Sequence, residues 1–161
     1  MVRYPHMARR KRIQWEHGDL FAVPLVDGSF GIVQAIDHWM PHWIYTAVTD
    51  RRVEAVPSTA TMHGPGRVIS LIAVSDDAFD FGGFTRVGPA SVLARRKDFP
   101  NERFARSGYV GAKSYTDGIV ADFLSAWHGL SPWTQYKDPE YFDKLLVSGV
   151  RRPSDAANGG G

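Results

Sequence analysis

The residues best suited to acid–base or metal chemistry in the first third of the chain lie in the stretch DHWMPHW, which contains Asp37, His38 and His42. Two histidines four residues apart can bind one metal ion when both lie on one face of a helix. Pro41 lies between them and interrupts a helix, and the flanking residues favour strands. The spacing therefore predicts a hydrogen-bonded turn, and no third ligand is evident from the sequence.

A second acidic cluster, Asp76, Asp77 and Asp80, follows an apolar run. Carboxylate oxygens at this spacing could hold a divalent cation, but an EF-hand loop would need alternating acids, a central glycine and a closing glutamate. Paired carboxylates could also perform acid–base catalysis at a separation that the sequence does not give. We expect instead a solvated loop with one helical turn, whose acids form a candidate protein-binding patch.

Other signatures of catalysis are missing from the sequence. The chain has no cysteine, so a disulfide, a cysteine nucleophile and a cysteine-bound metal are excluded. It has no G-x-S-x-G, no P-loop and no G-x-G-x-x-G, and the run from His63 to Gly66 is typical of a flexible loop. The sequence therefore predicts a protein that is not an enzyme, with no cofactor and no metal.

Aromatic residues are dense in the last third of the chain. Most should seal helices onto a sheet, because large apolar side chains favour burial. Trp and Tyr are also enriched where proteins bind each other, and Trp133 and Tyr136 are therefore further candidates for protein binding.

Charge is nearly balanced along the 161 residues, with a net charge of +2 and a pI near 9.0. The excess is concentrated in Arg9–Arg12, within a polar segment 1–13 that we expect to be a basic arm. This run, with strand aromatics such as Trp39, Trp43 and Tyr45 as stacking faces, leaves a nucleic-acid-binding or general interaction module as the alternative function. No apolar run is long enough to span a membrane, no secretory signal is evident, and a cytoplasmic location is expected.

The clearest structural signal is a β-hairpin. Alternating apolar residues predict strands at Leu20–Val26 and Ser29–Asp37, and Asp27-Gly28 between them favours a type I′ turn. Pro24 cannot donate to a ladder and should lie at an edge or bulge, and Gly31 indicates a bend or a close backbone approach.

The remaining elements follow in chain order, with strands first and helices last. Strands are expected at Trp43–Thr49, Arg52–Val56, Arg67–Val74 and Ala90–Ala94, with Asp50-Arg51 as a turn. Helices are expected at Gly118–His128, capped by Asp117, and from Asp138-Pro139 onward.

This order predicts an α+β fold: a small, strongly bent antiparallel sheet or SH3-like barrel of about five to six strands followed by two C-terminal helices. Residues 14–148 should form one domain, and residues 149–161 a disordered tail.

One segment resembles a known family. The stretch HGDLFAVPLVDGSFGIVQAI resembles the opening of the immunity protein 26 family of bacterial polymorphic toxin systems. The residues that match the pattern include Gly18, Asp19, Phe21, Ala22, Val23, Pro24, Leu25, Asp27, Gly28 and Gly31. The resemblance implies a cytoplasmic antidote that binds a cognate toxin and blocks it by occlusion. These positions shape a hairpin, so the resemblance implies a scaffold and a broad role but no binding residues.

Overall fold

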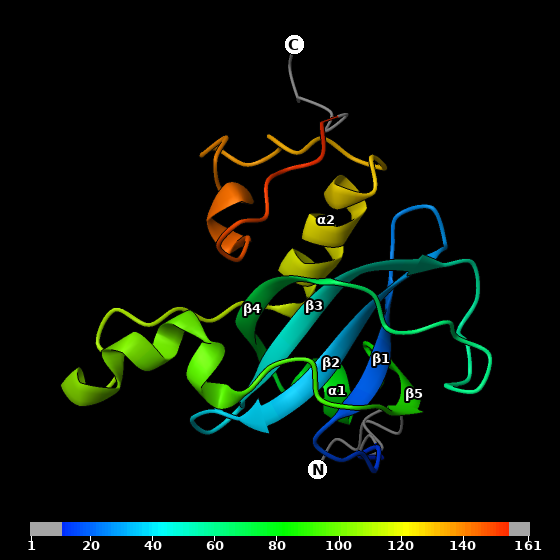
Figure 1. Ribbon diagram of the computed structural model, residues 1–161, viewed down its shortest axis with the longest axis horizontal. Coiled ribbons are helices and arrows are strands. Elements are labelled where there is room, and N and C mark those ends of the chain that lie inside the picture. The colour runs from blue at the N-terminus through cyan, green and yellow to red at the C-terminus, as the bar shows by residue number, and fades with distance from the viewer. Residues whose placement is uncertain (1–10, 155–161) are drawn as a thin grey trace, which may run out of the picture.

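The computed structural model of the protein describes residues 11–154. Its centre is one five-stranded antiparallel sheet with the order β4-β3-β2-β1-β5 (Figure 1). The strands are β1 (Asp19–Pro24), β2 (Phe30–His38), β3 (Trp43–Val53), β4 (Val68–Ser75) and β5 (Thr85–Pro89). The helices are α1 (Asp77–Asp80) and α2 (Asp117–Trp127), with 3₁₀ helices η1 (Arg96–Asp98), η2 (Pro100–Ser107) and η3 (Asp143–Leu145). This is the small α+β fold that the sequence predicts. Within the described residues, no helix has the length and apolar character needed to cross a bilayer.

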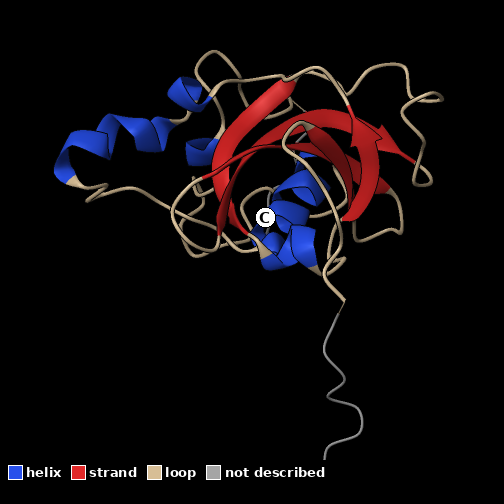
Figure 2. Cartoon of the chain, turned by 90° about the horizontal axis from the view of Figure 1, so that it is seen from below, coloured by secondary structure: helices blue, strands red, loops and turns tan. Residues whose placement is uncertain are grey.

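The sheet is bent around α2, which lies on its concave side (Figure 2). Alternate residues of a strand face opposite sides of the sheet, as the period of a strand requires. Ile44 of β3 packs with Phe123 and Leu124 of α2, whereas its neighbour Tyr45 packs on the opposite face with Phe99. On the side away from α2, the buried residues form two clusters: one around Tyr45, and a smaller one of Leu20, Ala22 and Ile32. We call the cluster around Phe123 the concave core and the cluster around Tyr45 the convex cluster.

The strand order ends at β4 and β5, and pairing between these two strands is not among those found in residues 11–154. A barrel would need that pairing. The structure therefore matches the bent sheet, the first of the two architectures that the sequence predicts.

The predicted hairpin is present, but its turn is of a different type. Gly28 N donates to Leu25 O and Leu25 N donates to Ser29 O, which defines a three-residue loop. Of the three loop residues, only Gly28 has a positive φ, which is 86°. A type I′ turn requires a positive φ at Asp27 as well. The loop is therefore a type I turn closed by a glycine bulge, and Asp27 contributes by accepting bonds from Ser29.

The other residues of the resemblance motif have structural surroundings. Asp19 is buried and accepts a bond from Arg86 of β5 at 2.7 Å. Pro24 lies at the exposed end of β1, beyond its last pairing with β5. A Cβ on Gly31 would lie 2.6 Å from Leu124 of α2, so the predicted close approach is confirmed. The motif therefore joins the hairpin to its neighbours.

Three predicted elements differ from the structure. β3 continues through Asp50-Arg51 as one strand with an irregularity at Val48/Thr49, so the predicted turn there is wrong. The last strand is β5, which ends before Ala90. The second C-terminal helix is absent among the described residues: Asp138 accepts from Glu140 N and starts a turn, and only the short η3 follows. Its aromatic residues reach the core as a compact loop instead.

The ends of the predicted domain also carry contacts. Val150 packs against the concave core and Arg152 forms an ion pair with Asp143, so packing extends past residue 148. Ile13 N donates to Asp80 O. Most of the predicted basic arm, residues 1–10, and residues 155–161 of the predicted tail lie outside the described residues.

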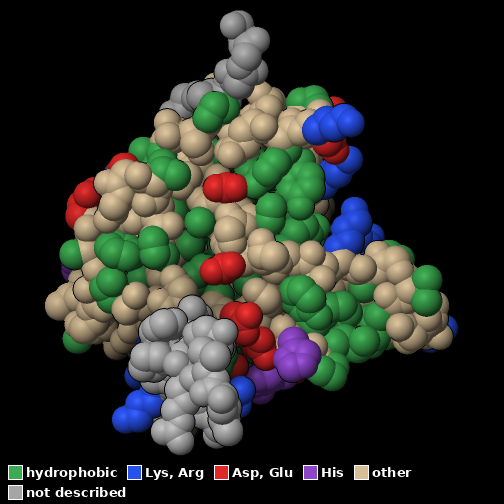
Figure 3. Space-filling model, turned by 180° about the vertical axis from the view of Figure 1, so that it is seen from behind, with side chains coloured by type: hydrophobic (Ala, Val, Ile, Leu, Met, Phe, Trp, Pro, Cys, Tyr) green, Lys and Arg blue, Asp and Glu red, His purple; other side chains and the backbone are tan. Residues whose placement is uncertain are grey.

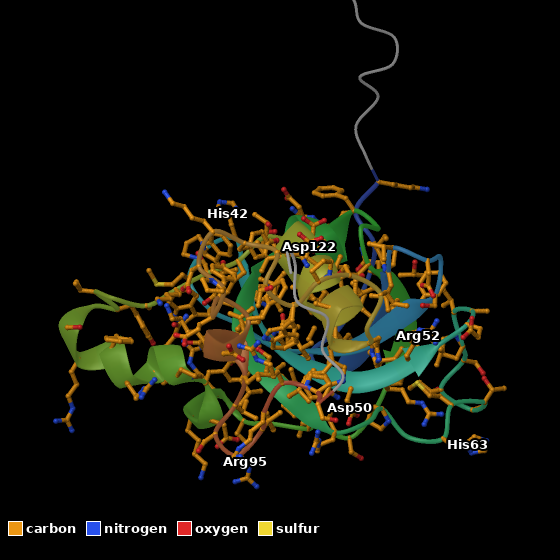
Figure 4. All side chains as sticks on the ribbon, turned by 90° about the horizontal axis from the view of Figure 1, so that it is seen from above. His42, Asp50, Arg52, His63, Arg95 and Asp122 are labelled. Atoms are coloured by element: carbon orange, nitrogen blue, oxygen red, sulfur yellow. The ribbon has the colours of Figure 1, made fainter. Side chains whose placement is uncertain are left out.

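Residues 95–113, which we call the lobe, project from the sheet beside β4 (Figure 1). They contain η1, η2 and a return segment that begins at Gly108. Arg95 at the start of the lobe is exposed and points outward (Figure 4). The lobe and the C-terminal segment approach β4 from different directions, and this arrangement creates the site described next.

Candidate functional site

The three predicted acidic residues lie on or next to α1, where they have different environments. Asp80 is 9% exposed and accepts a 2.9 Å bond from Trp15 Nε1, so it anchors the segment before β1. Asp76 lies 3.5 Å from Nδ1 of His42, and Asp77 is exposed. Only Asp77 and part of Asp76 therefore remain open to a partner.

Acidic and histidine side chains gather on the face shown in Figure 3. His42 lies at a turn and points away from the sheet (Figure 4), and His38 at the end of β2 is 2.7 Å from His17. Trp15 stacks on His38. Within residues 11–154, no group of three or more His, Asp or Glu side chains is placed to hold a metal ion. The geometry is that of the hydrogen-bonded turn expected from DHWMPHW.

The two aromatic residues predicted to bind a partner, Trp133 and Tyr136, both make contacts within the fold. Trp133 is 1% exposed and packs in the concave core, so it is not accessible to a partner, and the prediction that it binds one is wrong. Tyr136 is half-buried and donates to Asp122, and burial together with this carboxylate raises the pKa of its hydroxyl. Tyr136 therefore remains partly accessible.

The strand aromatics that would support nucleic-acid binding are largely unavailable. Trp39 and Tyr45 are buried and stack on each other with ring centroids 5.5 Å apart, and only Trp43 keeps partial exposure. Of the basic run at Arg9–Arg12, Lys11 and Arg12 are described and exposed. Stacking platforms must present an open ring face, so the structure weakens this alternative.

A polar network fixes the lobe to the sheet. Arg96 donates to Glu102 at 2.9 Å and to the carbonyl of His38 at 2.9 Å, and its guanidinium lies over the ring of Tyr45. Tyr45 donates to Glu102 at 2.8 Å. Burial opposes ionisation of Glu102, but hydrogen bonds from Tyr45, Tyr109 and Arg96 outweigh it and lower its pKa. This network sets where the lobe lies relative to β4.

Between the lobe and the C-terminal segment lies a cavity of about 240 Å³. Its apolar lining comes from β4, η2, the end of η3 and the residues that follow, and it comprises Leu71, Ile72, Pro100, Phe104, Leu145, Leu146 and Val147. Two neighbouring hollows share residues with it: Lys113, Tyr115 and Lys144 on one side, and Arg103, Leu146 and Val147 on the other. Together they form one continuous depression, which we call the β4 groove.

The groove exists because the free edge of β4 is only partly covered. Val147 N donates to Ile69 O, and Tyr115 exchanges backbone bonds with Ala73 and Ser75. Leu71 lies between these two points of pairing and lines the cavity. An edge strand with uncovered backbone is a place where another chain can bind.

The rim of the groove is basic. Lys97, Arg103 and Lys113 line it and are exposed, and none of them forms an ion pair with the residues that the structure describes. Lys144 contacts Asp138 at 2.6 Å, and this carboxylate raises the pKa of its ammonium group. Basic side chains are visible in the indentation beside the lobe in Figure 3.

Sequence reasoning missed this site, although one signal was present. Residues 95–113 contain six Lys or Arg and two Asp or Glu. The lobe therefore has a net charge of +4, whereas the whole chain has a net charge of +2. The apolar half of the groove, Leu146 and Val147, lies in a segment expected to be a helix, so its approach to β4 could not be foreseen.

Scans of protein-family models, curated proteins and solved structures found no match to this chain. The resemblance to the immunity protein 26 family therefore rests on residues 17–36 alone.

Proposed function

We propose that this chain is a non-catalytic binding protein of the immunity type, which blocks a cognate bacterial toxin in the cytoplasm by occluding its working surface. The observation that carries the proposal is the β4 groove, an apolar cavity at a partly open strand edge, whose rim carries Lys and Arg side chains without a carboxylate partner in the described part of the chain. Clefts of this kind, apolar with a few polar groups, are typical of sites that recognise another molecule.

The resemblance at residues 17–36 supports the choice of immunity over other binding roles. Those residues build the hairpin and its contacts with β5 and α2, so they are compatible with a shared scaffold whose binding surface varies. The groove lies at the β4 edge of the sheet, and β3 separates it from the hairpin. A conserved scaffold and a separate partner surface are what a family of antidotes against different toxins needs.

A rescue experiment tests this function. The product of the neighbouring gene, tested as the candidate toxin, is expressed from an inducible promoter in a bacterial host, with and without the full chain. We expect colony counts to recover when the chain is present, and the purified pair to form a stable complex. A toxin that kills equally well in the presence of soluble, folded chain would contradict the proposal.

A further inference from the structure

The β4 groove combines an apolar cavity with three cations, Lys97, Arg103 and Lys113, that have no carboxylate partner among the described residues, and this combination specifies what it can bind. Accepting the proposed function as a basis, we propose that the groove binds an acidic, extended segment of a partner protein, with one large apolar side chain of that segment inserted in the cavity.

The size and lining of the cavity account for the apolar side chain. An engineered apolar cavity of about 150 Å³ binds benzene, so a space of about 240 Å³ has room for a phenyl or leucyl group. Leu71, Leu146 and Val147 are each half-buried, which leaves apolar surface to be covered. An apolar anchor in a pocket is the usual centre of a protein interface.

The rim accounts for the acidic flanks. Arg103 and Lys113 line the central cavity, and Lys97 lines the adjoining hollow. Because these cations have no carboxylate partner among the described residues, glutamates or aspartates on either side of the anchor would gain ion pairs without displacing existing ones. Lys144 already has Asp138 and should contribute less.

The groove continues from the central cavity into two adjoining hollows, which favours an extended segment over a small molecule. The adjoining hollows continue past Tyr115 in one direction and past Leu146 in the other. A basic groove could also hold a phosphodiester backbone, and Phe104 and Tyr115 contribute aromatic rings to the lining. Both rings belong to half-buried residues, however, and most of the apolar lining, such as Leu71, Leu146 and Val147, is aliphatic. The observations therefore favour a protein segment.

Fluorescence anisotropy with a labelled seven-residue peptide tests the inference. The peptide carries a central phenylalanine between three glutamates on each side, and its two controls carry serine in place of phenylalanine or lysines in place of the glutamates. We expect saturable binding of the first peptide, and binding about tenfold weaker or more for either control. No saturation up to about 1 mM peptide would overturn the inference.

Charge reversal locates the binding. Lys113→Glu should weaken binding of the acidic peptide about tenfold, whereas Arg106→Glu should leave it within about twofold. Arg106 is a matched control because it is an exposed cation on the same lobe that does not line the groove. Equal effects of the two substitutions would show that net charge alone attracts the peptide, and would overturn the site. Circular dichroism of both variants establishes that they fold.

A single-stranded oligonucleotide with the same net charge as the acidic peptide tests whether the groove binds nucleic acid instead of a protein segment. If it binds more tightly than the peptide and shows the same loss with Lys113→Glu, the groove is a nucleic-acid site and the inference is wrong. Neutralisation of the toxin that persists in Lys113→Glu would reject the groove but keep the immunity function. Peptide binding by a chain that fails to neutralise the toxin would keep the groove and reject that function.

Discussion

The concave core and the lobe are held by different forces. The concave core joins 20 buried apolar residues from the sheet, α1, α2 and the C-terminal segment, whereas the convex cluster beneath the lobe has six. The lobe depends in addition on Arg96, Glu102 and Tyr45, which link it to the sheet through hydrogen bonds. Apolar burial is strong but not directional, whereas hydrogen bonds between charged groups are directional and, when partly exposed to solvent, contribute less net free energy.

This contrast indicates that one region determines the stability of the fold and the other determines the position of the lobe. α2 and the concave core should determine whether the chain folds, and the Arg96 network should determine where the lobe lies against the β4 groove. A binding surface built on the more weakly held element can adjust to a partner without endangering the fold.

The largest expected effect lies in the concave core. Phe123 is fully buried and contacts Trp133 and Phe142. Phe123→Ala should lower the free energy of unfolding by about 3–5 kcal/mol, because it removes burial and leaves a cavity. Urea unfolding followed by circular dichroism measures this loss.

Val110→Ala is the matched control in the lobe, since Val110 is 74% exposed, and it should change the free energy of unfolding by less than about 0.5 kcal/mol. A loss below about 1 kcal/mol for Phe123→Ala would contradict the assignment of the concave core as the main source of stability.

A smaller and local effect is expected from Arg96→Ala. It removes the bonds to Glu102 and His38, but the Arg96 side chain is 39% exposed, so solvent screening limits the loss to about 1–2 kcal/mol. Hydrogen exchange should become faster in residues 100–113 while α2 remains protected.

Arg106→Ala, on the same lobe but outside the network, should leave exchange unchanged. Equal acceleration in α2 and the lobe with Arg96→Ala would show that the two regions unfold as one unit, and the distinction drawn between them would fail.

The smallest effect is a pH dependence confined to the lobe. The pKa of Glu102 lies below its usual 4.5 in the folded protein, so its contribution is fully present above 4.5 and is lost as pH falls through the lower, folded value. We expect backbone NMR signals of the lobe to shift or broaden in that acidic range before those of α2. Glu102→Gln should abolish the difference between the regions, and a lobe that titrates identically in this variant would exclude Glu102 as the cause.

The sequence alone determined the elements whose signals are local. Alternating apolar residues located β1 and β2, the apolar stripe located α2 within one residue, and Gly31 indicated the approach of another element. These predictions succeeded because the spacing of apolar residues, and the lack of a side chain at glycine, can be read from a short stretch of sequence. The turn type at Gly28 was missed because Asp-Gly suits both a type I′ turn and the glycine bulge found here.

Only the tertiary structure decided which segments meet. Trp133 has the composition of a binding residue, yet the sheet, α2 and Phe142 enclose it. The β4 groove draws Leu71, Lys113 and Val147 from three distant segments, and none of them carries a motif. A groove depends on long-range packing and on an edge left partly open, and a linear pattern records neither.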